Sequence, residues 1–172
     1  MTTGKDALNN INTIADLYAH FSVKNDEELE KMYMELDQRL MMSGSWDYKN
    51  ESFLTNQIAK AIEKVGLENT TNVEERYWLQ QMVWLWYHHA ITCAIEKYGD
   101  AQQALEFSEK ALQWQPKNHP NKITRLLYLL LKNEVAQAKE WTATITTEPE
   151  RTTSLAILTS YEEGTFLNKS EP

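Results

Sequence analysis

An internal repeat in the second half of this chain limits its possible folds more than any other pattern. A shift of 34 residues aligns Gly99-Asp100 with Asn133-Glu134, Ala101 with Val135, Ala104 with Ala138, Phe107 with Trp141, and Ala111 with Ile145. Pro116 and Pro149 are 33 residues apart. A fixed period of this length is typical of stacked helical hairpins, because each hairpin has an apolar face that it cannot bury alone. The repeat therefore predicts helix pairs with a common spacing.

The stretch from Tyr98 to Asn118, YGDAQQALEFSEKALQWQPKN, resembles the second half of a tetratricopeptide repeat. It has Gly-Asp at the turn, then Ala, an aromatic residue, Ala-Leu and Pro at that family's intervals. Residues 119–149 are similar to the family more loosely, since Asn133 replaces the turn glycine and Ile145 the late alanine. The resemblance covers about 80 residues, at about 85–160, and no repeat signature precedes Trp78. It implies a right-handed superhelix whose concave face binds peptides or helices of other proteins.

Helical periodicity extends over the rest of the chain. Apolar residues recur at spacings of three and four, while Gly and Pro occur only five and four times. This pattern predicts helices at about 6–21, 26–42, 53–65, 78–95, 101–112, 121–131, 135–145 and 149–161, with another start near Thr71 or Asn72. We expect an all-α fold, with helical hairpins in a tetratricopeptide-like array and a helical N-terminal half. Its parts are an N-terminal segment (1–72), two hairpins with a closing helix (73–162) and a flexible tail (163–172), together forming one structural domain.

Several residues are placed to begin or end these helices. Asn25, with Glu28 three residues later, resembles a capping pair, and Asn50 and Asp100 can each cap a following helix. Gly66 stands where a left-handed residue ends a helix, and Pro149 stands where a last helix can begin.

One predicted helix carries no charge, because residues 78–95 contain no Asp, Glu, Lys or Arg. Its length admits a membrane span. Polar residues such as Gln80, Gln81 and His88 interrupt the run. Burying such side chains in a lipid bilayer without hydrogen-bond partners costs free energy. The pattern favours a central helix that packs against neighbours on more than one side.

The resemblance also implies which residues line the concave face. The matching positions are Trp86, His89, Cys93, Glu96 and Lys97 in the first hairpin, and Ile123, Leu127, Leu130 and Leu131 in the second. Chaperone-binding members of the family hold a C-terminal carboxylate with Lys and Asn at the positions of His89 and Cys93. Neither residue can form that clamp, which argues against a cochaperone role.

Soluble monomers rarely expose a large apolar patch, so we expect another helix to cover the apolar part of that face. Two alternatives exist for this cover. An N-terminal helix of the same chain could cover it. A partner's amphipathic helix, or a second copy of this chain, could dock there instead.

Charge and motifs exclude several classes of function. The net charge of −8 and pI of about 5.0 disfavour nucleic acid or an anionic membrane as the partner. An acidic run at residues 26–37 is expected to be a solvated helix face, although it could meet Lys122, Arg125 and Lys132. The chain has no Gly-rich phosphate loop, and His88, His89 and Cys93 lack further ligands in the sequence for a metal ion. We therefore expect no cofactor and no metal.

These observations predict a cytoplasmic, non-enzymatic protein-interaction module, such as an adaptor, scaffold or dedicated chaperone. The lone Cys93 and the absence of an export pattern near Met1 favour the cytoplasm. One alternative is a self-associating structural helical protein whose concave face is filled by its own chain, and a homodimer is a possible assembly. A helical enzyme without a recognisable motif is another.

Overall fold

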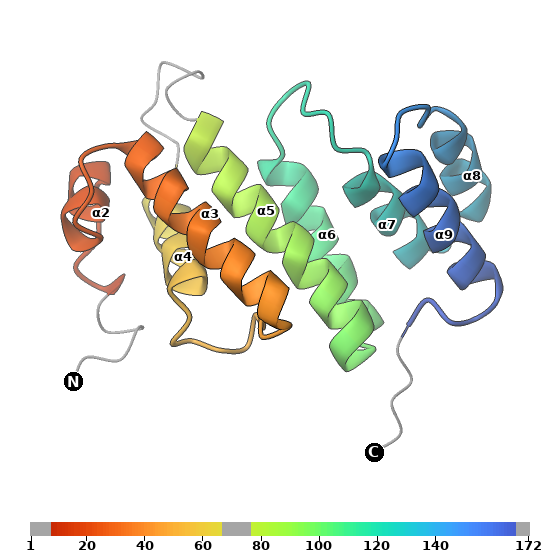
Figure 1. Ribbon diagram of the computed structural model, residues 1–172, viewed down its shortest axis with the longest axis horizontal. Helices are drawn as coiled ribbons and strands as arrows, with labels where there is room; N and C mark the ends of the chain where they lie inside the picture. Colours follow the sequence, from red (N-terminus) through yellow and green to blue (C-terminus); the bar gives the residue numbers. More distant parts are fainter. Residues whose placement is uncertain (1–7, 67–76, 168–172) are drawn as a thin grey trace. The chain divides into compact units, whose positions relative to one another are not determined.

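The computed structural model describes residues 8–66 and 77–167. The residues described form helices and their connections, with no strand among them (Figure 1). In chain order, the helices are α2 (Ile14–His20), α3 (Asp26–Ser43), α4 (Leu54–Val65), α5 (Tyr77–Cys93), the π-helical η2 (Ala94–Tyr98), α6 (Ala101–Trp114), α7 (Ile123–Leu131), α8 (Val135–Ala143) and α9 (Glu150–Glu162). The predicted all-α fold is confirmed. None of the described helices combines the length and apolar character needed to cross a membrane.

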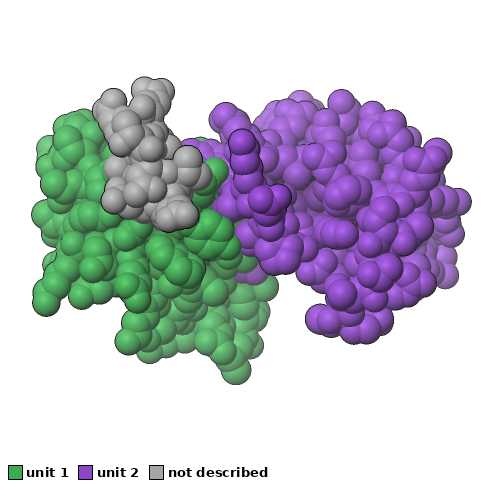
Figure 2. Space-filling view, turned by 90° about the horizontal axis from the view of Figure 1, so that it is seen from above, with its two compact units in different colours: residues 1–86 green, residues 87–172 purple. Residues whose placement is uncertain are grey.

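The chain divides into two compact units, residues 1–86 and residues 87–172, which Figure 2 distinguishes by colour. The division falls inside α5, between Trp86 and Tyr87. The boundary expected near residue 72 and the helix start expected near Thr71 lie within 67–76, outside the described residues. Each unit contains buried apolar side chains of its own.

In the first unit, α4 packs against both α2 and α3. Asn25 caps α3 as predicted, because its Oδ1 accepts a hydrogen bond from the Glu28 N–H (2.9 Å). Gly44 ends α3 in the left-handed conformation (φ 69°), which a residue without Cβ adopts at little cost. The largest buried side chains of these helices are mostly aliphatic, namely Leu17, Leu29, Tyr33, Ile58 and Ile62.

Two predictions about helices of the first unit are wrong. A turn interrupts the helix expected over 6–21, and α2 begins at Ile14 because Thr13 and Asp16 form a capping box there. Asn50 does not cap α4; its Oδ1 accepts the Ser52 N–H (3.0 Å) in the preceding turn. An Asn side chain can satisfy a turn as readily as a helix end, so its position alone does not distinguish the two.

The second unit contains two hairpins and a closing helix. Helix α6 packs against η2 and α7, α7 packs against α8, and α9 packs against both α7 and α8. The hairpin turns contain Gly99 (φ 58°) and Asn133 (φ 59°), which are 34 residues apart and share the left-handed conformation. Ala104 and Ala138, aligned by the same repeat, are both fully buried. The two hairpins therefore share a left-handed turn residue and a buried alanine at positions that the sequence repeat aligns.

The π-helical turn η2 shifts the register between the two hairpins. In the first, the Asp100 N–H donates to the Ala94 carbonyl (2.9 Å), whereas in the second the Glu134 N–H donates to the Leu129 carbonyl (2.9 Å). A residue that precedes the turn in the first hairpin therefore corresponds to the residue 35 positions later in the second hairpin, not 34. The reason is that the π turn of the first hairpin contains one residue more than the turn of the second. Burial agrees with this register, since Ile95 is buried like Leu130 while Glu96 is exposed.

Candidate functional site

The apolar residues predicted to face a partner on α7 are mostly part of the core of the second unit. Ile123, Leu127 and Leu130 are 7%, 5% and 1% exposed, and Leu131 is half-buried. Leu130 belongs to a buried cluster with Leu126, Leu129 and Ala138, against which Ile157, Leu158 and Tyr161 of α9 pack. Most of this apolar stripe is therefore covered by the chain itself. It offers a partner little surface without a rearrangement.

Trp86 belongs to the first unit and is buried there, with 5% of its surface exposed. Its Nε1 donates a hydrogen bond to Asn56 Oδ1 (2.7 Å), and its ring centre lies 5.9 Å from that of Trp46. The Asn56 amide in turn donates to the carbonyls of Asp47 and Asn50 (2.9 and 2.7 Å). These bonds satisfy polar groups inside the core, so Trp86 has a structural role in this conformation.

The other predicted residues of the first hairpin are more accessible. His89 and Cys93 are half-buried on α5, whereas Glu96 and Lys97 are exposed on η2. The Lys97 ammonium lies 5.6 Å from the centre of the Tyr98 ring. The register shift at η2 means that these residues do not occupy the same positions as the α7 residues aligned with them by the 34-residue spacing.

His88, beside these residues, links α5 to α7 within the second unit. Its Nδ1 lies 3.0 Å from Thr124 Oγ1. Burial, together with the nearby His89 and His119, which disfavour a second positive charge, lowers the pKa of His88 from 6.5 to about 4. His88 is therefore neutral at pH 7. In the part of the chain that the structure describes, no group of three His, Cys, Asp or Glu side chains is placed to hold a metal ion.

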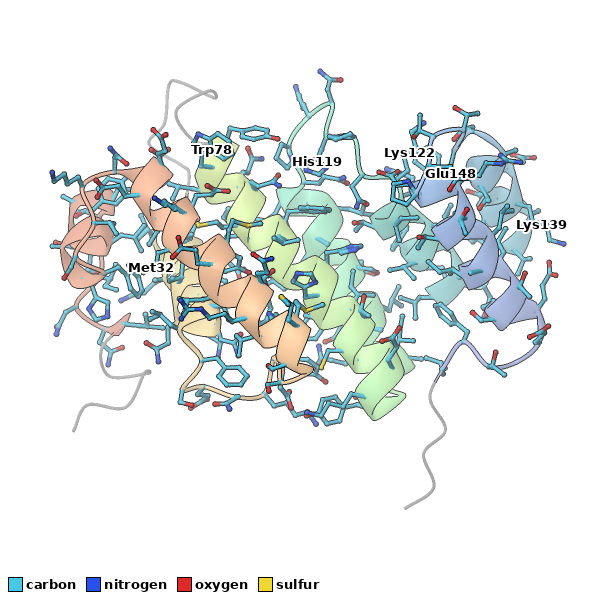
Figure 3. The ribbon with its side chains drawn as sticks, viewed as in Figure 1. Met32, Trp78, His119, Lys122, Lys139 and Glu148 are labelled. Carbon is cyan, nitrogen blue, oxygen red and sulfur yellow. The ribbon has the colours of Figure 1, made fainter. Side chains whose placement is uncertain are left out.

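The solvent-facing side of α7 forms a surface that the sequence reasoning did not assign. It consists of Lys122, Arg125, Tyr128 and Lys132, together with Trp141 of α8, and is called the basic–aromatic surface below. Arg125 and Lys132 are exposed, and the other three are half-buried. Figure 3 labels Lys122 at the N-terminal end of α7.

Trp141 holds two cations at one end of this surface. The Arg125 guanidinium carbon lies 5.4 Å from the centre of the Trp141 ring, and the Lys122 ammonium lies 5.9 Å from it. The indole is fixed by a hydrogen bond from its Nε1 to the Lys122 carbonyl (2.9 Å). Farther along α7, the Lys132 ammonium lies 5.5 Å from the Tyr128 ring centre. The cations are thus held over aromatic rings, which attract them through the negative face of the π system.

Within the second unit, no carboxylate of the described residues forms an ion pair with Lys122, Arg125 or Lys132. Lys139 of α8 differs, because its ammonium lies 3.3 Å from Glu162 Oε1 of α9. The basic–aromatic surface therefore carries positive charge that the described residues of its own unit do not neutralise.

Comparison of the chain with known protein families, curated proteins and solved structures identified no relative. No family model matches the chain, and no curated protein or solved structure is significantly similar to it.

Proposed function

We propose that this protein is a tetratricopeptide-like interaction module that binds another protein through its second unit. The observation that carries the proposal is the repetition of one hairpin design, with left-handed residues at Gly99 and Asn133 and buried alanines at 104 and 138. Repeat arrays of this kind use their extended surfaces for binding. The role, as adaptor, scaffold or dedicated chaperone, needs neither a catalytic group nor a cofactor.

The recognition surface in this proposal comprises the accessible side chains of the second unit. His89, Cys93, Lys97 and Leu131 remain candidates, because each keeps part of its surface exposed. The buried residues Ile123, Leu127 and Leu130 support the surface from beneath and are not proposed as contacts.

Their burial also bears on self-association, the alternative function. Since the chain's own helices cover these side chains, the α7 core provides no large apolar patch to drive a homodimer. Light scattering that gives the monomer mass at micromolar concentration supports this part of the proposal, whereas a stable dimer mass contradicts it.

The test is an affinity capture with the full chain as bait, from cells that contain the protein, followed by co-elution of bait and captured protein in size-exclusion chromatography. The matched control bait is Leu130→Asp, which places a charge in the core of the second unit and is expected to unfold that unit. The proposal predicts a captured protein that co-elutes with the natural chain and is lost with Leu130→Asp. Capture that survives unfolding of the second unit, or no co-eluting protein, contradicts the proposal.

A further inference from the structure

Two cations of the basic–aromatic surface, Lys122 and Arg125, occupy positions that are uncharged and buried in the first hairpin. In the register set by η2, Lys122 corresponds to Tyr87 and Arg125 to Ala90, while Phe107 corresponds to Trp141. The Tyr87 and Phe107 ring centres are 5.9 Å apart, so a ring–ring contact stands where the second hairpin has a cation over a ring. Tyr87 and Ala90 are buried. Packing of such a hairpin therefore does not require cations at these two positions.

The local excess of positive charge is unusual for this chain. Residues 117–139 contain Lys117, Lys122, Arg125, Lys132 and Lys139 with Glu134 as the single acid, although the whole chain has a net charge of −8. Of these cations, Lys139 has an ion-pair partner in Glu162. Opposite charge on a partner would complement the three cations of the basic–aromatic surface and favour its orientation.

Arg125 is arranged to bind a carboxylate. Its guanidinium lies over the Trp141 ring, and none of its guanidinium N–H groups donates to another described residue of the second unit. A guanidinium stacked on an aromatic ring keeps the donors at its edge available, and two of them match the two oxygens of a carboxylate. Lys122 donates one hydrogen bond, to the Thr144 carbonyl (3.4 Å), and retains two further donors. The half-buried rings of Tyr128 and Trp141 add apolar area beside these donors.

We propose that the basic–aromatic surface binds an acidic segment of a partner protein in which Asp or Glu alternates with apolar residues. Arg125 and Lys132 contact the carboxylates, and the rings of Tyr128 and Trp141 contact the apolar side chains. This inference rests on the proposed function and specifies the chemistry of the partner. An acidic protein segment fits the surface better than RNA or a lipid bilayer, because the strongly negative remainder of the chain repels a polyanion larger than a short peptide.

The experiment is a fluorescence anisotropy titration of the full chain at low ionic strength. The probe is a fluorescein-labelled peptide in which Asp and Glu alternate with Leu, and the control probe is the same peptide with Asn and Gln. The proposal predicts binding of the acidic peptide and at least about tenfold weaker binding of the amide peptide. It also predicts that about 0.3 M salt weakens the acidic complex several-fold.

Single substitutions locate the binding surface. Arg125→Ala should weaken binding of the acidic peptide about fivefold. The affinity of Arg125→Lys should lie between those of Arg125→Ala and the natural chain, because an ammonium keeps the charge but lacks the paired donors of a guanidinium. Lys132→Ala should weaken it about threefold. Lys139→Ala is the matched control and should leave binding unchanged, since its cation is already paired with Glu162. Circular dichroism of each variant confirms that the fold is retained.

Several outcomes overturn the proposal. Equal binding of the acidic and amide peptides does so, as does an Arg125→Ala variant that binds as tightly as Lys139→Ala. Stronger binding of single-stranded RNA or of phosphatidylserine vesicles at this surface also overturns it. A chain that captures a protein from cells equally well with and without Arg125→Ala refutes the acidic segment but leaves the proposed function standing.

Discussion

Replacing Leu130 with Ala should destabilise the second unit strongly, although the family resemblance places Leu130 on a partner-binding face. The side chain is 1% exposed and lies in the cluster formed with Leu126, Leu129 and Ala138. Removing most of a buried leucine side chain costs about 2–5 kcal/mol, because it loses transfer free energy and leaves a cavity. For a chain of this length each kcal/mol lowers Tm by about 2–4 °C, so a mid-range cost of about 3.5 kcal/mol predicts a decrease of about 7–14 °C.

Leu131→Ala is the matched control, since it removes the same atoms from the adjacent, half-buried position. We expect a loss of about 1 kcal/mol or less, because part of that side chain is in water in the folded protein. The assay is thermal and urea unfolding of both variants, followed by circular dichroism under identical conditions. Equal destabilisation by the two substitutions, or a greater effect of Leu131→Ala, would refute the assignment of Leu130 to the core and would favour an exposed, partner-binding position for it.

Three further predictions concern the hairpin turn, pH and the core of the first unit. Gly99→Ala should cost about 1–2 kcal/mol in urea unfolding, because Gly99 has φ 58°, whereas Asn133→Gly at φ 59° should cost less than about 0.5 kcal/mol; equal costs would contradict the turn assignment. Because the folded-state pKa of His88 is lowered from 6.5 to about 4, the unfolded chain binds the proton more tightly, and up to about 3 kcal/mol of stability should be lost as pH falls from 6.5 towards 4. His88→Gln should reduce the slope of unfolding free energy against pH in that range, and an unchanged slope would exclude His88 as the source. Trp86→Phe should cost about 1–3 kcal/mol in the same unfolding assay, because Asn56 Oδ1 loses its 2.7 Å donor, and a neutral substitution would show that this hydrogen bond is not needed.

Local signals in the sequence predicted much of the backbone. Asn25 and Asp100 cap α3 and α6 as expected, because a side-chain oxygen beside a helix start satisfies an otherwise unpaired N–H. Helix α9 begins directly after Pro149, as expected for a residue whose fixed φ suits the first helical turn. These features depend on neighbours within a few residues, which periodicity and capping patterns describe well.

The candidate site depends on contacts between helices, which patterns of neighbouring residues in the sequence do not reveal. The spacing of apolar residues on α7 indicated that Leu127 and Leu130 would be buried. It could not show whether a partner protein or other helices of the same chain would bury them. The π turn at η2 has no sequence signature and changes which residues of the two hairpins correspond. The cations of α7 were visible in the sequence, but their placement over Trp141 follows only from the packing of α8 on α7.

A direct measurement of the central claim, that the basic–aromatic surface of the second unit binds an acidic segment of a partner protein, is a ¹H–¹⁵N correlation spectrum of the full chain titrated with the acidic peptide. The six tryptophan indole N–H groups provide reporters at defined places. The indole peak of Trp141 and the backbone peaks of Arg125 and Lys132 should shift progressively to saturation, while the indole peak of the buried Trp86 should stay in place. A spectrum without shifts at saturating peptide, or shifts centred on Trp86, would contradict the account.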